Sequence, residues 1–206
     1  MPDLSELINL SKKHVKPASF MLSRAFQNDP VLRWQIPDEN KRLSNLHYFW
    51  ELSLRIGIKY GEVYGTSEDL EGITVWRPPK KVNISYWKYI RKGAIKFPFK
   101  FGIKSTKRIT FVQAVNDSIR NIYMKIPYWY LDVIGVDPHY QGKGFASMLL
   151  EPMLRRIDKE NLPIWLETVL ERNVSFYERF GFYILEEIII PKTNIVNWFM
   201  IRESDI

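Results

Sequence analysis

The spacing of apolar residues over the first sixty positions predicts two helices. Residues 18–27 place apolar side chains at helical spacing, and a turn at residues 28–30 ends this segment. Residues 33–37 are predicted to form a short connector. Asp38, a favourable N-cap residue, precedes a second apolar stripe over residues 40–58. The chain is therefore predicted to begin with a short helix followed by a long amphipathic helix.

The pattern then changes to that of strands. Residues 62–66 and 72–76 are rich in β-branched and aromatic side chains, and a turn-rich stretch over residues 67–69 joins them. Pro78 and Pro79 end the second segment, because proline has no N–H to donate to a sheet. The two segments are predicted to form an antiparallel hairpin.

Strands and helices alternate in the second half of the chain. A helix capped by Ser105 is predicted from an apolar stripe, and a strand over residues 128–136 follows it. The next helix begins after Gly144 and contains Pro152, where we expect a kink because one backbone hydrogen bond is lost. A strand over residues 163–168 completes a strand–helix–strand unit that should be parallel and right-handed. The apolar stripe of the helix predicted after Ser105 consists of Ile109, Val112, Val115, Ile119, Ile122 and Ile126.

The C-terminal residues complete the predicted sheet. Gly181 is placed to end a short helix, because glycine readily adopts the left-handed conformation found there. Residues 183–190 and 195–201 are predicted to be two long strands. The order of elements indicates a mixed α/β fold with helices packed on a central sheet.

Composition restricts the kinds of chemistry. With 206 residues, of which 46% are hydrophobic, the chain is expected to form one domain over residues 1–206 with a sizeable core. The sequence contains no cysteine, which excludes disulfides, a thiolate nucleophile and cysteine-ligated zinc. It has no apolar run of the roughly 18 residues that a membrane helix needs, and its first residues lack the apolar core of a signal peptide. We therefore expect a cytoplasmic protein without a metal and without a transmembrane segment.

The positive charge is concentrated in one segment. Residues 77–125 contain 13 Lys and Arg and one acid, Asp117, within a chain of net charge +7. We predict a basic helical insertion at about residues 80–126, in which residues 85–104 interleave aromatics with lysines. Such a segment can pack its aromatics on the core, cover a substrate, or bind anionic lipid or nucleic acid.

A loop between the strand at 128–136 and its helix has the properties of an anion site. Residues 141–146 read Gln-Gly-Lys-Gly-Phe-Ala. The two glycines let the backbone turn tightly and approach a ligand closely. The amides that open the following helix have no intrahelical partner and lie at the positive end of the helix dipole, so they suit a phosphate. A plain glycine turn between strand and helix is the alternative.

Two motifs carry a resemblance to a known family. The pattern Q-x-x-G-x-A over residues 141–146, after a strand ending in V-x-P, resembles the pyrophosphate-binding motif of the GNAT superfamily of N-acetyltransferases. NVSFYERFGF over residues 173–182 resembles a second segment of that family. The combination of GVDPHYQGKG, LPIWLET and ERNVSFYERFGF is most similar to the puromycin N-acetyltransferase-like branch. This resemblance implies a mostly antiparallel sheet with one parallel strand pair splayed apart to form an acetyl-CoA cleft.

The resemblance also implies roles for individual residues. Backbone amides of the first splayed strand would face the pantetheine arm of acetyl-CoA, and Asn173 would contact coenzyme A. Tyr177 would protonate the leaving thiolate as general acid, which suits a phenol that stays protonated at neutral pH. Alternatively, Asn173 is a helix N-cap and Tyr177 an amphipathic core residue. The implied coenzyme A contacts are Ile134, Val136, Gln141, Gly142, Lys143, Gly144, Phe145, Ala146 and Asn173.

The general base is not determined by these motifs. Asp132 and Glu167 lie on the two central strands, so each is a candidate base, with a structural polar role as the alternative. Tyr128 stands about where some superfamily members carry a glutamate base, which leaves a water relay open. His139 precedes the loop and is expected to be exposed.

Several functions remain compatible with the sequence. The leading hypothesis is acetyl transfer from acetyl-CoA to a primary amine of a small molecule, by direct attack on the thioester. A protein or peptide amine is an alternative acceptor, and a non-catalytic acyl-CoA-binding module is a second class. A third class, binding of lipid or nucleic acid through residues 77–125, should show a steep salt dependence. Coenzyme A is itself a polyanion that accounts for basic residues, so nucleic acid is not an expected partner, and a homodimer remains open.

Overall fold

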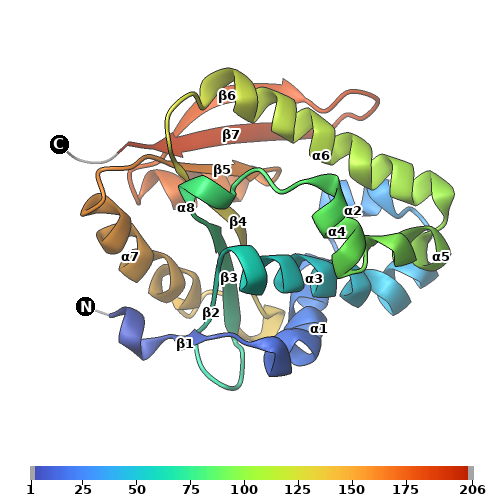
Figure 1. Ribbon diagram of the computed structural model, residues 1–206, viewed down its shortest axis with the longest axis horizontal. Coiled ribbons are helices and arrows are strands. Elements are labelled where there is room, and N and C mark those ends of the chain that lie inside the picture. Colours follow the sequence, from blue (N-terminus) through green and yellow to red (C-terminus); the bar gives the residue numbers. More distant parts are fainter. Residues whose placement is uncertain (1–2, 204–206) are drawn as a thin grey trace.

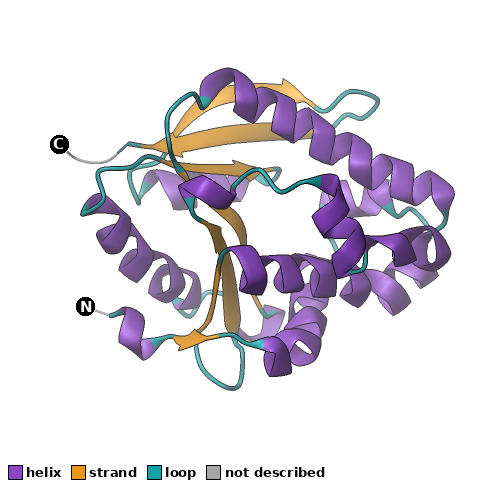
Figure 2. Ribbon diagram, viewed as in Figure 1, coloured by secondary structure: helices purple, strands orange, loops and turns teal. Residues whose placement is uncertain are grey.

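A computed structural model describes residues 3–203 and shows a seven-stranded sheet with helices on both faces (Figures 1 and 2). The strand order is β1-β2-β3-β4-β5-β7-β6, and all neighbouring strands are antiparallel except β4 and β5. This arrangement confirms the predicted mixed α/β class and the mostly antiparallel sheet. Residues 1–2 and 204–206 of the predicted domain lie outside the described residues. The strands are β1 (Ile8–Asn9), β2 (Glu62–Gly65), β3 (Gly72–Arg77), β4 (Trp129–Val136), β5 (Ile164–Thr168), β6 (Tyr183–Ile189) and β7 (Val196–Arg202).

Two apolar clusters hold the helices on the sheet. On one face α1 (Val15–Phe26) and α3 (Glu39–Tyr60) pack on Val63, Ile73 and Val133. On the other face α7 (Phe145–Asp158) and α8 (Glu171–Glu178) pack on residues such as Trp129 and Leu166. Burial of these apolar side chains is the main contribution to stability. Short 3-10 turns connect the elements: η1 (Leu4–Glu6), η2 (Lys12–His14), η3 (Pro79–Lys81), η4 (Ala94–Lys96) and η5 (Pro138–Tyr140).

The N-terminal helices follow the predicted pattern with one exception. The Asp38 carboxylate accepts a hydrogen bond from the Lys41 amide at 3.0 Å, as expected of the N-cap of α3. The predicted connector at residues 33–37 is wrong, since α2 (Pro30–Gln35) occupies most of it. Its N-cap is Asp29, which accepts from the Leu32 amide at 2.9 Å, and Pro30 stands in the first turn, where a missing N–H is harmless.

The segment between β3 and β4, residues 78–128, is helical and is called the β3–β4 connection. It contains α4 (Tyr86–Lys92), α5 (Phe97–Phe101) and α6 (Ile103–Tyr123). The prediction that Ser105 caps a helix is wrong, because α6 begins after Gly102, which has φ +87°, and Ser105 is buried within the first turn. In Figure 1 α6 runs along β6 and β7.

The apolar stripe predicted for α6 is only partly buried. Val112 is buried, but Ile122 and Ile126 are each 61% exposed. The position that enters the core near the end of the helix is Arg120, with 1% exposure. Its guanidinium reaches a carboxylate of β5, so an ion pair acts together with the packing of Ile119 and Tyr123 to fix this end of α6 to the sheet.

A bulge bends β4 at Asp132. Val75 of β3 pairs with Val133, whereas the next residue, Trp76, pairs with Leu131, so Asp132 is the extra residue of β4. A bulge bends its strand and changes which face the following side chains meet. Accordingly Leu131 packs with α7 whereas Val133 packs with α1 and α3.

The parallel contact between β4 and β5 is short. Only two residue pairs, Trp129 with Ile164 and Tyr130 with Trp165, are in register. Beyond the bulge β4 continues to Val136 with pairing only to β3, and β5 continues to Thr168 with pairing only to β7. The two central strands therefore stop pairing at the bulge, and one edge of residues 131–136 is left without a strand partner in the described structure.

Candidate active site

A loop joins the end of β4, whose edge is free, to the start of α7. Gly142 and Gly144 have φ of +78° and +85°, a conformation that disfavours other residues. A Cβ atom built on either glycine meets no atom within 4 Å, so the space beside both is open. The first backbone bond of α7 runs from the Met148 amide to the Gly144 carbonyl, which leaves the preceding amides without an intrahelical acceptor. Open space, glycine and free amides together are suited to an anionic group.

Other loop residues are held by local contacts. The Gln141 side chain donates to the Val136 carbonyl at 3.1 Å and so ties the loop to the end of β4. The Lys143 ammonium lies 5.0 Å from the centre of the Tyr140 ring, on which Phe145 also packs edge-on at 5.8 Å. The half-buried Ala146 follows in the first turn of α7. These contacts leave Lys143 on the exposed side of the loop, where a cation can meet a phosphate.

A buried carboxylate anchors the base of this loop. Asp137, at 4% exposure, accepts two hydrogen bonds on Oδ2 from Arg24 of α1, at 2.8 and 2.5 Å. Its Oδ1 accepts from the His139 amide at 3.1 Å and lies 2.9 Å from His139 Nδ1. Burial alone would raise the pKa of Asp137, but the hydrogen bonds from His139 and Arg24 lower it overall. The His139 ring itself is largely exposed, as expected from the sequence.

The residues from the second motif lie on α8. Asn173 donates from Nδ2 to Thr168 Oγ1 at 3.1 Å, which ties α8 to the end of β5. The interpretation of Asn173 as an N-cap is wrong, because the N-cap is Leu170 and Asn173 lies within the first turn. Gly181 has φ +83° and follows the end of α8, as predicted.

Tyr177 faces inward from α8. Its side chain is buried against Phe176 and Phe182, with ring centres 5.3 and 5.7 Å away. No hydrogen bond to its hydroxyl is found among residues 3–203. Burial raises the pKa of Tyr177, so its phenol remains protonated at neutral pH. Tyr177 therefore has an aromatic ring packed among apolar side chains and a hydroxyl that is protonated at neutral pH.

The two candidate bases have different surroundings. Glu167 accepts hydrogen bonds on both oxygens, from Arg120 at 3.0 Å, Trp165 Nε1 at 2.9 Å and the Tyr130 hydroxyl at 2.7 Å. Asp132 accepts from Arg77 at 3.0 and 2.7 Å, both on Oδ2. Within the described part of the chain no hydrogen bond to Asp132 Oδ1 is found. Asp132 thus has a free oxygen at the bulge, whereas Glu167 has none.

Three arginines of this site were not identified from the sequence. Arg24 pairs with a residue 113 positions away, and Arg77 and Arg120 pair with residues 55 and 47 positions away. No motif marks such long-range partners. Tyr128 is buried beside this network.

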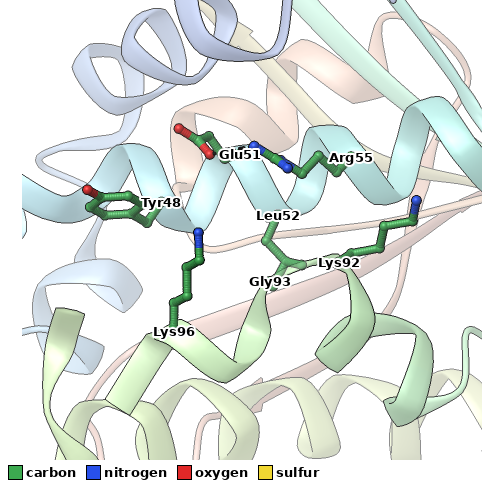
Figure 3. Close-up of a pocket in the computed structure, with 7 residues that line it drawn as sticks. All are labelled: Tyr48, Glu51, Leu52, Arg55, Lys92, Gly93 and Lys96. Atoms are coloured by element: carbon green, nitrogen blue, oxygen red, sulfur yellow. Dashed lines mark hydrogen bonds and ion pairs between the residues drawn. The ribbon is translucent and has the colours of Figure 1, made fainter. Parts of the chain in front are cut away.

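Two hollows lie away from the loop. One, of about 30 Å³, lies between α3 and the α4–η4 corner (Figure 3), and its lining includes Tyr48, Arg55, Lys92 and Lys96. The other, of about 130 Å³, lies between α1 and α3 and is lined in part by Arg24 and Arg42. No group of three or more His, Asp or Glu residues able to hold a metal is found in residues 3–203.

Comparison with solved structures identifies the fold. The structure resembles that of a histone acetyltransferase and related acetyltransferase from Corynebacterium glutamicum, with a TM-score of 0.68 and 18% identity over 100% of this chain and 97% of the other. It also resembles arylalkylamine N-acetyltransferase 2 from Aedes aegypti, with a TM-score of 0.65 and 14% identity over 97% and 98% of the two chains. These similarities show the acetyltransferase fold.

Comparison of the sequence identifies a matching family model and two related proteins. The model of the acetyltransferase (GNAT) family matches residues 110–182. An uncharacterized N-acetyltransferase of Schizosaccharomyces pombe is 29% identical over 94% of this chain and 81% of its own length. An uncharacterized protein of Saccharomyces cerevisiae is 35% identical over 80% of this chain and 68% of its own length. Residues 110–182 therefore match the GNAT acetyltransferase family, whose members use acetyl-CoA, and the chain as a whole is similar to an N-acetyltransferase.

The Arg24–Asp137 contact gives a prediction about stability. Asp137→Asn should lower the free energy of unfolding by about 2 kcal/mol at pH 7, because a buried ion pair and its hydrogen bonds are weakened. Since the pKa of Asp137 is lowered in the folded state, its stabilisation is present above the ordinary value of about 3.9 and is lost as pH falls through the folded value. The difference in the free energy of unfolding between Asp137→Asn and wild type, measured by urea unfolding, should therefore be smaller near pH 3 than at pH 7. The exposed Asp69→Asn is the control, and equal stability of Asp137→Asn and wild type at pH 7 would contradict the anchoring role.

Proposed function

We propose that this protein transfers an acetyl group from acetyl-CoA to a primary amine of a small molecule, by direct attack of the amine on the thioester. The observation that carries the proposal is the unpaired edge of β4, which is followed, after the short turn η5, by the open glycine loop. An extended chain can pair with the edge, and a diphosphate can bind the loop. The two features follow one another along the chain, and the motif over residues 141–146 lies at the second of them.

Each of the two features suits one part of coenzyme A. Backbone groups of β4 around Ile134 and Val136 would hold the pantetheine arm as an added strand. The amides of residues 142–146, with Lys143 beside them, would hold the pyrophosphate. Donors aimed at a thioester oxygen from β4 contribute about 3 kcal/mol to transition-state stabilisation in comparable sites. Asn173 would contact coenzyme A from α8, in addition to its contact with Thr168.

Tyr177 is proposed to be the general acid. A buried phenol with a raised pKa stays protonated at neutral pH and is available as a proton donor. Negative charge develops on the sulfur of coenzyme A as the C–S bond breaks, and a hydroxyl within reach can donate its proton there. The amine attacks the thioester carbon, the C–S bond breaks, and the proton of the Tyr177 hydroxyl passes to sulfur.

Asp132 is the better of the two candidate bases. Its free Oδ1 lies at the bulge where β4 parts from β5, and the Arg77 contacts on Oδ2 orient the carboxylate. Glu167 would have to give up hydrogen bonds on either oxygen to accept a proton. We therefore assign the proton of the attacking amine to Asp132, directly or through a water, and a structural role to Glu167.

Two points of similarity support the proposal of a small-molecule acceptor. The motifs over residues 135–182 resemble the puromycin N-acetyltransferase-like branch, and the Aedes aegypti structure is titled an arylalkylamine N-acetyltransferase. Both favour a small amine with an aromatic group over a protein amine. The test is release of free thiol from acetyl-CoA in the presence of aromatic amines, aliphatic amines and peptides. Turnover with peptides alone would contradict the small-molecule acceptor and indicate a peptide amine. Binding of coenzyme A without turnover of any amine would indicate a non-catalytic binding module.

The loop assignment is tested with a matched pair of glycine variants. Gly144→Val should reduce coenzyme A affinity by at least about a hundredfold, because the β-branched side chain fills the space assigned to the pyrophosphate. Gly102→Val is the control, since Gly102 has a similar φ of +87° and equally open surroundings but lies in the β3–β4 connection. Affinity is measured by titration calorimetry. If both variants bind coenzyme A equally well, the loop does not hold the pyrophosphate.

The general acid is tested by removing one hydroxyl. Tyr177→Phe should lower kcat by about 10²–10⁴-fold while coenzyme A affinity stays near wild type, because the aromatic packing is retained. Tyr183→Phe, which removes an exposed hydroxyl on β6, is the control. An unchanged kcat in Tyr177→Phe would exclude this hydroxyl as the proton donor.

The two carboxylates are distinguished by isosteric amides. Asp132→Asn should lower kcat by about 10²-fold or more at neutral pH, because an amide cannot accept the amine proton. Glu167→Gln should instead lower the free energy of unfolding by about 3 kcal/mol, since the buried Arg120 then keeps an ion pair only with Asp117, with a smaller change in kcat. The measurements are steady-state rates and urea unfolding of both variants. A larger loss of kcat in Glu167→Gln than in Asp132→Asn would reverse the assignment.

A further inference from the structure

The β3–β4 connection has an unusual charge. Residues 78–116 contain ten Lys and Arg and no Asp or Glu. The loop and strand assigned to coenzyme A lie outside this range, and among these basic residues Lys88, Lys100 and Arg108 contact aromatic rings of the body. Most of this charge is therefore not explained by the proposed acetyl transfer.

The same segment exposes large apolar side chains. Five of them, within eighteen residues of sequence, have more than 60% of their surface exposed to solvent. Large exposed apolar patches on soluble proteins mark interaction sites rather than unused surface. The five are Tyr86 (66%), Trp87 (72%), Ile95 (62%), Phe99 (87%) and Ile103 (67%).

The exposed side chains stand on a rigid base. Phe97 and Phe101 of α5 are buried in the cluster with α1 and α3, and Ile95 and Phe99 point away from it, one helical turn apart. In α4 the Tyr89 hydroxyl accepts a hydrogen bond from Arg77 at 3.0 Å, which fixes this face of the helix to the body. Tyr86 and Trp87 are exposed to solvent.

Further contacts fix the base to the body. Arg108 of α6 donates to the Trp34 carbonyl at 2.7 Å, and the Lys100 ammonium lies 4.2 Å from the centre of the Tyr48 ring of α3. A hollow of about 30 Å³ lies between α3 and the α4–η4 corner (Figure 3). These contacts fix the base, and the exposed aromatics are held outward.

We propose that the outer surface of α4, η4, α5 and the start of α6 binds to the surface of an anionic lipid bilayer. Exposed Trp, Phe and Ile side chains can enter the interfacial region of a bilayer, while the surrounding lysines and arginines meet lipid phosphates and carboxylates. None of the helices within residues 3–203 combines the length and apolar character needed to cross a bilayer, so the contact is peripheral.

The chemistry of the surface favours lipid over two other partners. Ile95 and Ile103 have no ring that stacks on a nucleic-acid base, yet both are exposed together with the aromatics. A second copy of the chain would bring two strongly basic surfaces together, and like charges repel. An anionic bilayer complements both the charge and the apolar side chains.

Vesicle flotation tests the proposal. The protein should float with vesicles that contain about 30 mol% phosphatidylserine in phosphatidylcholine and bind at least about tenfold more weakly to pure phosphatidylcholine. Binding should fall when NaCl is raised from about 0.1 M to about 0.5 M. The double variant Trp87→Ser/Phe99→Ser and the double variant Lys104→Glu/Lys107→Glu should each weaken binding at least about tenfold.

Matched controls keep the test specific. Ile189→Ser, at an exposed apolar position of β6, and Lys159→Glu, at an exposed position after α7, should bind vesicles like wild type. Coenzyme A affinity of all variants should be unchanged, so loss of vesicle binding and loss of cofactor binding are separate outcomes. Equal binding to both kinds of vesicle, no binding to either, or wild-type binding by the Trp87→Ser/Phe99→Ser variant overturns the proposal. Binding to a defined DNA duplex without binding to vesicles overturns it in favour of nucleic acid.

Discussion

The site depends on the point at which β4 and β5 stop pairing. Two parallel residue pairs join the strands, and the bulge at Asp132 then bends β4 away. A buried strand edge with unpaired backbone groups is unfavourable unless something else pairs with it. The short turn η5 joins the unpaired edge to the loop of residues 141–146, and one extended ligand can contact both. The acetyl-CoA assignment, the place of Asp132 and the role of α8 all follow from this divergence.

Two buried ion pairs flank the divergence. Arg77 pairs with Asp132 and Arg120 pairs with Glu167, and both guanidiniums lie near the Tyr130 ring, at 5.5 and 4.7 Å from its centre. Although burial by itself lowers the pKa of Arg120, the Glu167 carboxylate raises it overall, so this pair stays charged. Because Arg120 belongs to α6, the β3–β4 connection is fixed to the strand beside the site. The same segment that supports β5 from inside carries the basic and aromatic surface outside.

The sequence predicted features that depend on local chemistry. The Asp38 cap of α3, the β2–β3 hairpin and Gly181 after α8 each need only neighbouring residues, and all are present. The α2 helix was missed because its cap, Asp29, also resembles a turn residue. The inward face of α6 was misassigned because Arg120, a charged residue, is buried through a partner 47 positions away. The bulge and the Arg24–Asp137 contact could not be predicted, since they arise where distant segments meet.

Hydrogen exchange with and without coenzyme A tests the account most directly. If the free edge of β4 pairs with the pantetheine arm, amides between Leu131 and Val136 should exchange at least about tenfold more slowly in the complex, together with amides at the start of α7. Amides of α5, which lie far along the chain from the loop, serve as the internal reference. Tight binding of coenzyme A without added protection in either segment would contradict the central claim that these strands part to receive it.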